Sequence, residues 1–175
     1  GEILKTLNYE ERNVELAKIA GYLHDIGNAV NRIDHAQSGA ILAYNILTKM
    51  GMSCYEAGEI MLAIGNHDEN TGTAVSPISA ALILADKSDV HRTRVRNKDI
   101  TTFDIHDRVN YAVEHSEIYV DAYKMHAILE LEIDTKICPV MDYFEIFLDR
   151  MTMNRRAANF LGLEFKLVIN GTNLL

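Results

Sequence analysis

The chain has 175 residues, a length that suits one ordinary domain or one domain with a small appendage. Its formal net charge of -8 argues against general nucleic-acid binding, which depends on basic side chains that neutralise phosphates. Apolar residues make up 48% of the chain, but no apolar run approaches the roughly 20 residues that a membrane span needs. We therefore expect a globular cytoplasmic protein with no membrane partner.

The two cysteines of the chain, Cys54 and Cys138, lie far apart and form no C-x-x-C pattern. They indicate neither a disulfide framework nor a thiolate zinc site, and they favour a reducing compartment. Any metal in this protein must therefore be held by histidine and carboxylate side chains.

Helical periodicity and capping signals predict that about the first 115 residues are all-helical. Asn8 and Glu11 have capping-box spacing at the start of the first helix, and Gly51 is expected to end the second. Ser76 and Pro77 form a cap and first-turn pair for the fourth helix. The helices expected in chain order are 9–24, 35–50, 53–66, 78–95 and 107–114.

The pattern changes after residue 115, where apolar alternation and β-branched residues predict strands. The expected order is a hairpin of two strands, then a helix, then a last strand, over residues 118–123, 127–133, 139–161 and 164–169. The expected fold class is mainly α: a helical domain of residues 1–115, followed by a small α+β part (β-β-α-β) of residues 116–175. The hairpin could extend a partner's sheet and form a homodimer, or this part could cap the helices or bind an effector.

Four segments of the helical part carry side chains that can bind metals. His24 and Asp25 are adjacent near an expected helix end, and Gly27 permits a break that lets both face one ion. Asp86 follows a strongly apolar stretch, where a carboxylate needs a cation or a metal as its partner. The remaining candidates are His35, at the start of the second helix, and His67, just past the third.

This set of three imidazoles and two carboxylates could hold one or two divalent ions, with one carboxylate as a bridge. The ligand types suit Fe, Mn, Mg, Co, Ni or Zn without distinguishing among them. A pair of such ions can activate water and clamp the oxygens of a phosphate ester. Plainer alternatives stay open, because a lone histidine is more often a structural residue and Asp86 could pair with Lys87 or an arginine.

Basic residues that follow Asp86 could contact a substrate phosphate. Lys87 could reach a phosphate, or it could form a salt bridge with Asp86. Arg92 and Arg96 are four residues apart on one face of the expected helix, so both could bind a phosphate. The basic run that contains them could equally be a solvated face or pair with nearby acidic residues.

Acidic residues close to the candidate ligands could assist them. Asp68 and Glu69, which follow the third helix, could act as general acid or base for the leaving group, or they could be ordinary loop carboxylates. Asp89, three residues after Asp86, could accept a hydrogen bond from a ligand histidine and orient it.

The same segments carry a family resemblance. The string AGYLHDIGN resembles the signature of the HD-domain metal-dependent phosphohydrolases, in particular their HDIG-type variant. The later strings HAQSGA, IGNHDE and LADKSDV resemble, in order, two further histidine segments and the closing aspartate motif of that family. Together the four motifs cover about residues 10–95, close to half of the chain.

The resemblance implies an HD-type helical domain that binds one or two divalent metals and hydrolyses a phosphomonoester or phosphodiester, commonly of a nucleotide. Carried over by position, His24 and Asp25 resemble the central pair of the family, with Asp25 as the bridging ligand. The resemblance also implies that His35 and His67 bind the second metal and that Asp86 is the distal ligand of the first.

We therefore predict a metal-dependent phosphohydrolase of a small phosphorylated molecule, with a nucleotide favoured. Asp25 would take part in activating water, Lys87 would help to bind phosphate and Asp68 would assist the leaving group. One departure keeps alternatives open: the family usually has another metal-binding histidine upstream, and none precedes His24. We expect a segment carrying it to precede Gly1 in the whole protein. Otherwise the chain is a degenerate HD module that binds a nucleotide or effector without turnover, or a dimerisation protein whose metal only stabilises the fold.

Overall fold

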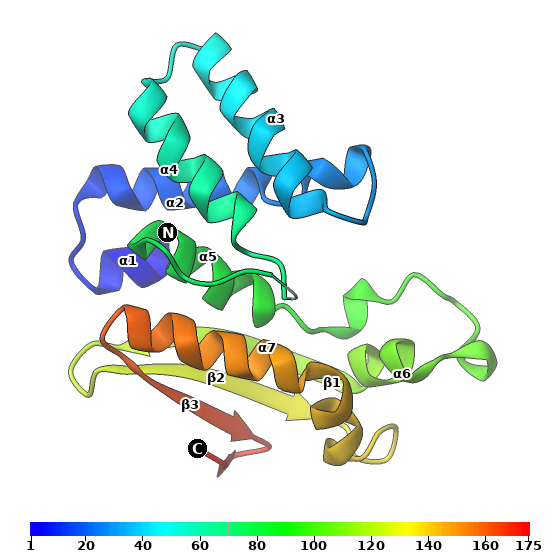
Figure 1. Ribbon diagram of the computed structural model, residues 1–175. Helices are drawn as coiled ribbons and strands as arrows, with labels where there is room; N and C mark the ends of the chain where they lie inside the picture. The colour runs from blue at the N-terminus through cyan, green and yellow to red at the C-terminus, as the bar shows by residue number, and fades with distance from the viewer. Residues whose placement is uncertain (70) are drawn as a thin grey trace.

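The protein is mainly α-helical, with a small sheet near its C-terminus (Figure 1). A computed structural model describes residues 1–69 and 71–175. The helices are α1 (Glu2–Thr6), α2 (Glu11–Leu23), α3 (His35–Lys49), α4 (Cys54–Gly65), α5 (Pro77–Lys87), α6 (Ile105–Ala112) and α7 (Val140–Phe160). The strands are β1 (Val113–Asp121), β2 (His126–Ile133), β3 (Glu164–Ile169) and β4 (Thr172–Asn173), and the 3-10 turns are η1 (Ile26–Ala29), η2 (Arg92–Arg94) and η3 (Ile100–Thr102). The expected fold class, a helical part followed by a small α+β part, is confirmed.

Helices α1 to α5 build the core of the helical part, by which we mean the chain up to the end of α6. Helix α3 packs along α4, and α2 contacts both α4 and α5. Burying one aliphatic side chain in such a core contributes about 1.5–3 kcal/mol to folding, relative to leaving it exposed to water. Helix α1 was not expected, because five residues are too few to show a helical period. The fully buried side chains of this core include Leu4, Val14, Ile60, Ile64 and Ile83.

Several helix ends lie where local signals in the sequence place them. The Oγ of Ser53 accepts a hydrogen bond from the backbone N–H of Glu56 at 3.2 Å, which caps α4. Ser76 and Ser79 form a reciprocal capping box at the start of α5. Gly51 follows α3 with a φ of 93°, a conformation that glycine adopts without steric cost. These caps confirm the expected boundaries of three helices.

The start of α2 differs from the sequence prediction. Asn8 adopts a left-handed conformation with a φ of 59°, and its N–H donates to the carbonyl of Lys5 at the end of α1. Glu10 then occupies the N-cap position of α2. The expected capping box of Asn8 and Glu11 is therefore wrong, because Asn8 serves the turn between two helices instead.

Helix α5 is shorter than the predicted helix over residues 78–95, because it ends at Lys87. The hydroxyl of Ser88 donates to the carbonyl of Leu84 at 2.6 Å, a side-chain bond that competes with helical backbone bonds. The carbonyl of Ser88 accepts a hydrogen bond from the hydroxyl of Ser116 in β1, also at 2.6 Å. This contact ties the end of α5 to the sheet and turns the chain away from the helix axis.

The sheet has the strand order β1-β2-β3-β4. Strands β1 and β2 form the expected antiparallel hairpin, and β2 and β3 are parallel, joined by the crossover helix α7. Asn170 and Gly171 have φ values of 52° and 75° and form the tight turn to β4, a strand of two residues that the sequence did not reveal. Strand β1 begins at Val113, directly after α6. The expected division of the chain into two domains at residues 115 and 116 stays a prediction.

Helix α7 lies between the helical part and the sheet (Figure 1). It packs against α5 on one side and against β2 and β3 on the other. Tyr143, Phe147 and Met151 are the buried side chains along its first half. We refer to β1–β4 and α7 together as the sheet part. Among the described residues, none of the helices combines the length and apolar character required to cross a lipid bilayer.

Candidate metal centre

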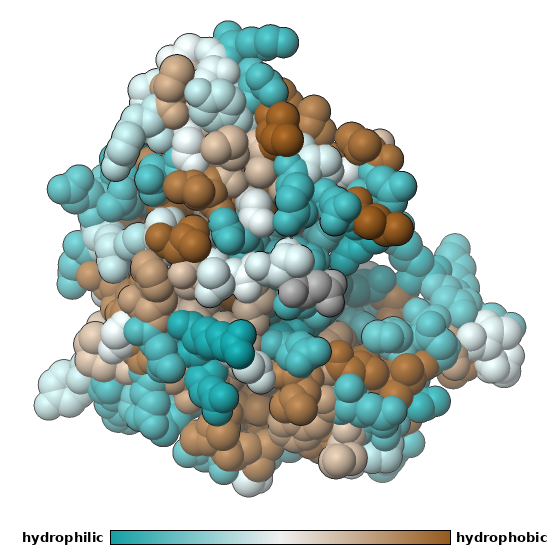
Figure 2. Space-filling view, viewed as in Figure 1, coloured by the Kyte–Doolittle hydropathy of each residue, from teal (hydrophilic) through white to brown (hydrophobic). Residues whose placement is uncertain are grey.

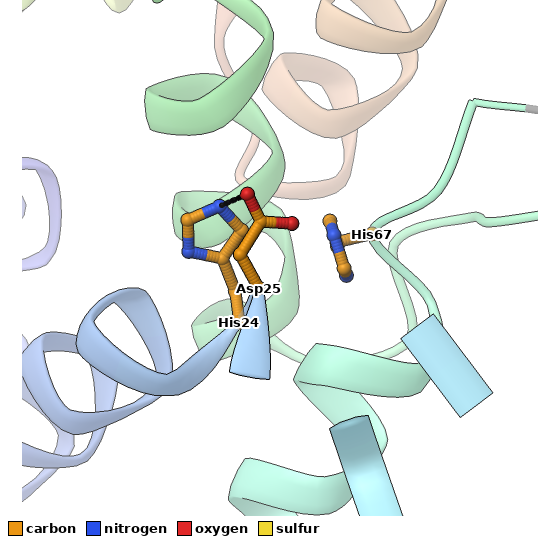
Figure 3. Close-up of side chains that lie close together, drawn as sticks. All are labelled: His24, Asp25 and His67. Carbon is orange, nitrogen blue, oxygen red and sulfur yellow. Dashed lines mark ion pairs between the residues drawn. The ribbon is translucent and has the colours of Figure 1, made fainter. Parts of the chain in front are cut away.

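The five predicted metal ligands come from four separate segments of the helical part, and the structure brings them together. His24 follows α2, Asp25 precedes η1, His35 begins α3, His67 follows α4, and Asp86 lies in the last turn of α5. We call this set the histidine–aspartate cluster. Figure 3 shows three of its members, His24, Asp25 and His67, whose nearest ligand atoms all lie within 4.8 Å of one another.

Short contacts connect all five members of the histidine–aspartate cluster. The Nε2 of His24 lies 3.6 Å from Oδ1 of Asp86 and 3.7 Å from Oδ2 of Asp25. The Nε2 of His35 lies 3.4 Å from Oδ1 of Asp25 and 3.2 Å from Nε2 of His67. Pairwise contacts of 3.2–3.7 Å therefore link all five side chains, each through an atom that can bind a metal.

Two glycines allow the segments to approach closely enough for this arrangement. A Cβ on Gly27 would lie 1.9 Å from the carbonyl oxygen of His35 and 2.7 Å from the backbone nitrogen of Gly39. No other residue fits at Gly27 without moving the backbone. The sequence prediction that Gly27 breaks the helix was therefore incomplete, because its main effect is to seat η1 on the first turn of α3. This contact places Asp25 beside His35.

Backbone carbonyls fix the orientation of all three imidazoles. A carbonyl oxygen only accepts hydrogen bonds, so an Nδ1 that faces one must carry the proton. In a neutral imidazole the Nε2 then has a free lone pair, and it is this atom that faces the centre of the cluster. The Nδ1 atoms donate to carbonyls three residues earlier, from His24 to Gly21 at 2.8 Å, from His35 to Arg32 at 3.1 Å and from His67 to Ile64 at 2.5 Å.

Burial and neighbouring charges set the protonation states around the centre. His67 is 1% exposed, and its burial lowers the pKa of its imidazole, which favours the neutral form. Burial alone would raise the pKa of Asp86, but its electrostatic interactions with His24 and with the charge of Lys87 outweigh burial and hold that pKa well below its usual value. The carboxylate of Asp86, 3.6 Å from Nε2 of His24, in turn raises the pKa of that imidazole. An ionised carboxylate and a neutral imidazole are the forms that bind metals.

Lys87 is buried beside the cluster rather than solvated. Its Nζ lies 2.6 Å from Oδ2 of Asp86 and 3.7 Å from Oε1 of Glu69. The salt bridge with Asp86, which the sequence left open, is therefore present. The same ammonium group also lines a cavity next to the cluster, so it is available to an anion bound there.

The cavity beside the histidine–aspartate cluster, which we call the cluster cavity, has a volume of about 40 Å³. This is room for about three water-sized groups, enough for a small ion with a few oxygen ligands. Viewed as in Figure 1, hydrophilic side chains line a recess between α3 and the region around α6 (Figure 2). Besides cluster members, the cluster cavity is lined by Glu69 and by four basic side chains, Arg32, Lys87, Arg94 and Arg150.

The predicted phosphate-binding residues Arg92 and Arg96 are not brought to the cluster cavity. The argument for them rested on a helix that ends before residue 92. Arg92 instead forms an ion pair with Glu114 at 2.8 Å and lies over the ring of Tyr111. Arg94, between the two predicted residues, is the member of this run that lines the cavity.

The acidic residues Asp89 and Asp68, which were predicted to assist the metal ligands or the reaction, lie in different places. Asp89 is beyond the end of α5 and forms an ion pair with Arg94, so the structure does not support its expected contact with His24 or His67. Asp68 lines a neighbouring pocket of about 310 Å³, which shares Arg32 and His35 with the wider site. Its predicted role in the reaction remains a proposal.

The sequence interpretation missed two residues that line the cavity, Arg32, which lies 3.8 Å from Asp25, and Arg150. Arg150 belongs to α7 in the sheet part, in which the sequence analysis named no site residue. Its Nε donates to Oε1 of Glu69 at 2.7 Å, and its guanidinium lies 4.5 Å from the ring centre of Phe147. The sequence did contain a sign that Arg150 faces inward. It stands one helical turn from Phe147 and next to Met151, both buried, in an otherwise apolar stripe.

Comparison with known protein families agrees with this geometry. The HD domain family matches residues 1–108, which is more than half of the chain. The chain therefore belongs to the HD-domain family of metal-dependent phosphohydrolases, whose members bind divalent metals. No curated protein and no solved structure matches the chain.

Proposed function

We propose that this protein binds one or two divalent ions through the histidine–aspartate cluster and hydrolyses a phosphate ester of a small molecule, with a nucleotide as the favoured class. The observation that carries the proposal is the series of 3.2–3.7 Å contacts that joins three imidazole Nε2 atoms and two carboxylates, three of which offer ligand atoms within 4.8 Å of one another. Fe, Mn, Mg, Co, Ni and Zn all suit this set of ligands.

The distance between two of the imidazoles supports a shared ion. The Nε2 atoms of His35 and His67 are 3.2 Å apart, and the hydrogen bonds at Nδ1 give both the role of acceptor. Two facing lone pairs repel each other unless a proton or a cation lies between them. A divalent ion held by both imidazoles would remove this repulsion, so His35 and His67 would hold one ion together.

We assign a separate role in phosphate-ester hydrolysis to each of three residues. Divalent ions, when bound, supply charge that polarises a phosphate ester and favours deprotonation of water. Asp25 is half exposed and lies between His24 and His35, which supports its role as a bridging carboxylate. Lys87 neutralises charge on the phosphate, and Asp68, in the adjoining pocket, is the proposed proton donor to the leaving group.

A second candidate function is a degenerate HD module that binds a phosphorylated ligand without turnover. The observation that favours it is the 2.6 Å ion pair between Lys87 and Asp86, in which a cation of the chain already neutralises one of the proposed ligands. In this case the cluster would stay folded and charge-balanced without a metal.

Elemental analysis of freshly purified protein, followed by a screen of phosphorylated metabolites with the metal found, separates the two functions. We expect one or two ions per chain and phosphatase or phosphodiesterase activity that Asp25→Ala abolishes. His115→Ala, which changes an exposed histidine in β1, should leave metal content and activity as they are. Protein that holds no metal and hydrolyses none of these compounds after addition of Mn, Fe, Co, Ni, Zn or Mg would refute the enzymatic function.

Three further predictions from the sequence complete this proposal. They are a cytoplasmic location, a possible role of the sheet part in a homodimer, and a boundary between two structural parts near residue 115. Sedimentation of the purified protein tests the second, since a homodimer doubles the 19.7 kDa mass of the chain.

A further inference from the structure

We propose that Arg150 of the sheet part and Arg94 of η2 form an anion-binding pair that recognises the substrate phosphate beside the histidine–aspartate cluster. The inference deepens the proposed function and rests on it. It assigns the sheet part a direct place in substrate binding, instead of the cap, dimer contact or effector site that the sequence left open.

The position of Arg150 is fixed from both sides. The ring of Phe147, which is 2% exposed, supports its guanidinium, and Oε1 of Glu69 accepts its Nε–H at 2.7 Å. The bond to Glu69 uses one of the five N–H donors of the guanidinium. The side chain of Arg150 is 22% exposed and lines the cluster cavity, so its remaining donors are close to a site that an anion can enter.

Arg94 and Arg150 form a wall between two spaces. Both line the cluster cavity, and both line a second pocket of about 160 Å³ that we call the α6 pocket. His106, Asp107 and Asn110 of α6 give the α6 pocket a polar lining. The cluster cavity has room for phosphate oxygens but not for a whole substrate, so the remainder of a polar substrate can extend past the two arginines into the α6 pocket.

Arginine suits this task because its planar fork donates two parallel hydrogen bonds to a phosphate. The local charge also favours an anion, since four basic side chains and three carboxylates line the cavity, an excess of positive charge in a chain whose net charge is -8. Glu69 lies 2.7 Å from Arg150 and 3.7 Å from Lys87, and Asp89 pairs with Arg94, so these two carboxylates are the counter-ions that an incoming phosphate must displace.

Substitution of Arg150 and substitution of Glu69, the two partners of one ion pair, should change phosphate affinity in opposite directions. Isothermal titration of metal-loaded protein with inorganic phosphate measures both changes. We expect Arg150→Met to weaken phosphate binding about tenfold or more, because a charge-assisted bond is lost. Glu69→Gln should tighten phosphate binding, because the competing carboxylate is removed while a similar shape remains. Arg150→Lys should bind with intermediate affinity, because it keeps the charge but not the fork.

Arg156→Met is the matched control, since Arg156 is an exposed arginine of the same helix and should leave phosphate binding unchanged. Arg94→Met is a second variant that weakens binding without touching the core of α7, which guards against misfolding of the Arg150 variant. Unchanged affinity in both arginine variants would overturn the inference. Equal weakening by Arg150→Met and Glu69→Gln would also overturn it, because the ion pair would then serve the fold alone.

Metal content and turnover, measured on the same samples, keep this result separate from the proposed function. If the wild-type protein holds metal and hydrolyses phosphate esters but Arg150→Met leaves both KM and phosphate affinity unchanged, only the inference fails. If the metal-loaded protein hydrolyses no ester yet phosphate affinity follows the expected order of variants, only the enzymatic function fails.

Discussion

The helical part and the sheet part contain buried polar side chains that are organised differently. In the helical part, His35, His67 and Lys87 are buried, and each has charged or polar partners in or beside the histidine–aspartate cluster. In the sheet part, Asn154 of α7 is fully buried, and neither atom of its amide has a hydrogen-bond partner among the described residues. The buried histidine and lysine side chains of the helical part therefore belong to one cluster, whereas the buried amide of Asn154 costs stability without an evident network among the described residues.

The largest loss of stability is expected at Gly27, where η1 and α3 of the helical part make a close backbone contact. Gly27→Ala would place a methyl group 1.9 Å from the carbonyl of His35, so η1 must move off α3. We expect a loss of about 3 kcal/mol in the free energy of unfolding, measured in urea, together with loss of bound metal.

Gly58→Ala provides the control for this substitution. Gly58 lies in α4, and a Cβ there would meet no atom within 4 Å. Alanine should raise stability by up to about 1 kcal/mol, because it favours the helix. If Gly27→Ala behaved like Gly58→Ala and kept its metal, the close packing of η1 on α3 would not be what positions the cluster.

A smaller effect of opposite sign is expected in the sheet part. Asn154→Leu removes an amide that lacks partners among the described residues and should stabilise the protein by about 1 kcal/mol. Asn159→Leu, at an exposed position of the same helix, should change stability by less than about 0.5 kcal/mol. A clear loss of stability in Asn154→Leu, seen in the same urea titrations, would show that the amide takes part in a network after all.

The smallest effect concerns the two cysteines, one in each part. Cys54 is exposed at the start of α4, whereas Cys138 is buried, and burial raises the pKa of its thiol from 9.0 to about 11. Because only the thiolate reacts, a disulfide reagent at pH 8 should modify Cys54 at least about 100-fold faster than Cys138, with no change in stability. Mass spectrometry of partly modified protein reads out the order. Equal rates would mean that the sheet part opens readily in solution.

The sequence predicted those features that local chemistry determines. The caps at Ser53 and Ser76, the stop at Gly51 and the turn at Asn170 depend on residues within a few positions of one another. The meeting of the five cluster side chains was also expected, because the four ordered motifs that carry them resemble the metal-binding motifs of the HD-domain family. The structure adds the reason for their orientation, which lies in carbonyls three residues before each histidine.

Features that depend on tertiary contacts were not predictable in the same way. The early end of α5 depends on the hydrogen bond between Ser88 and Ser116, two residues that are 28 positions apart. Arg150 reaches the site only because α7 packs against α5, and it pairs with Glu69 across 81 positions. Periodicity and motif spacing contain no information about such contacts.

The most direct test of the central claim is a long-range ¹H–¹⁵N correlation spectrum of histidine-labelled, metal-free protein at pH 8, repeated after addition of Zn²⁺. We expect three of the seven histidines, His24, His35 and His67, to carry their proton on Nδ1, and their Nε2 signals to shift when the ion is added. The exposed His115 serves as an internal reference. Protons on Nε2 of the cluster histidines, or Nε2 signals that Zn²⁺ leaves unmoved, would contradict the account.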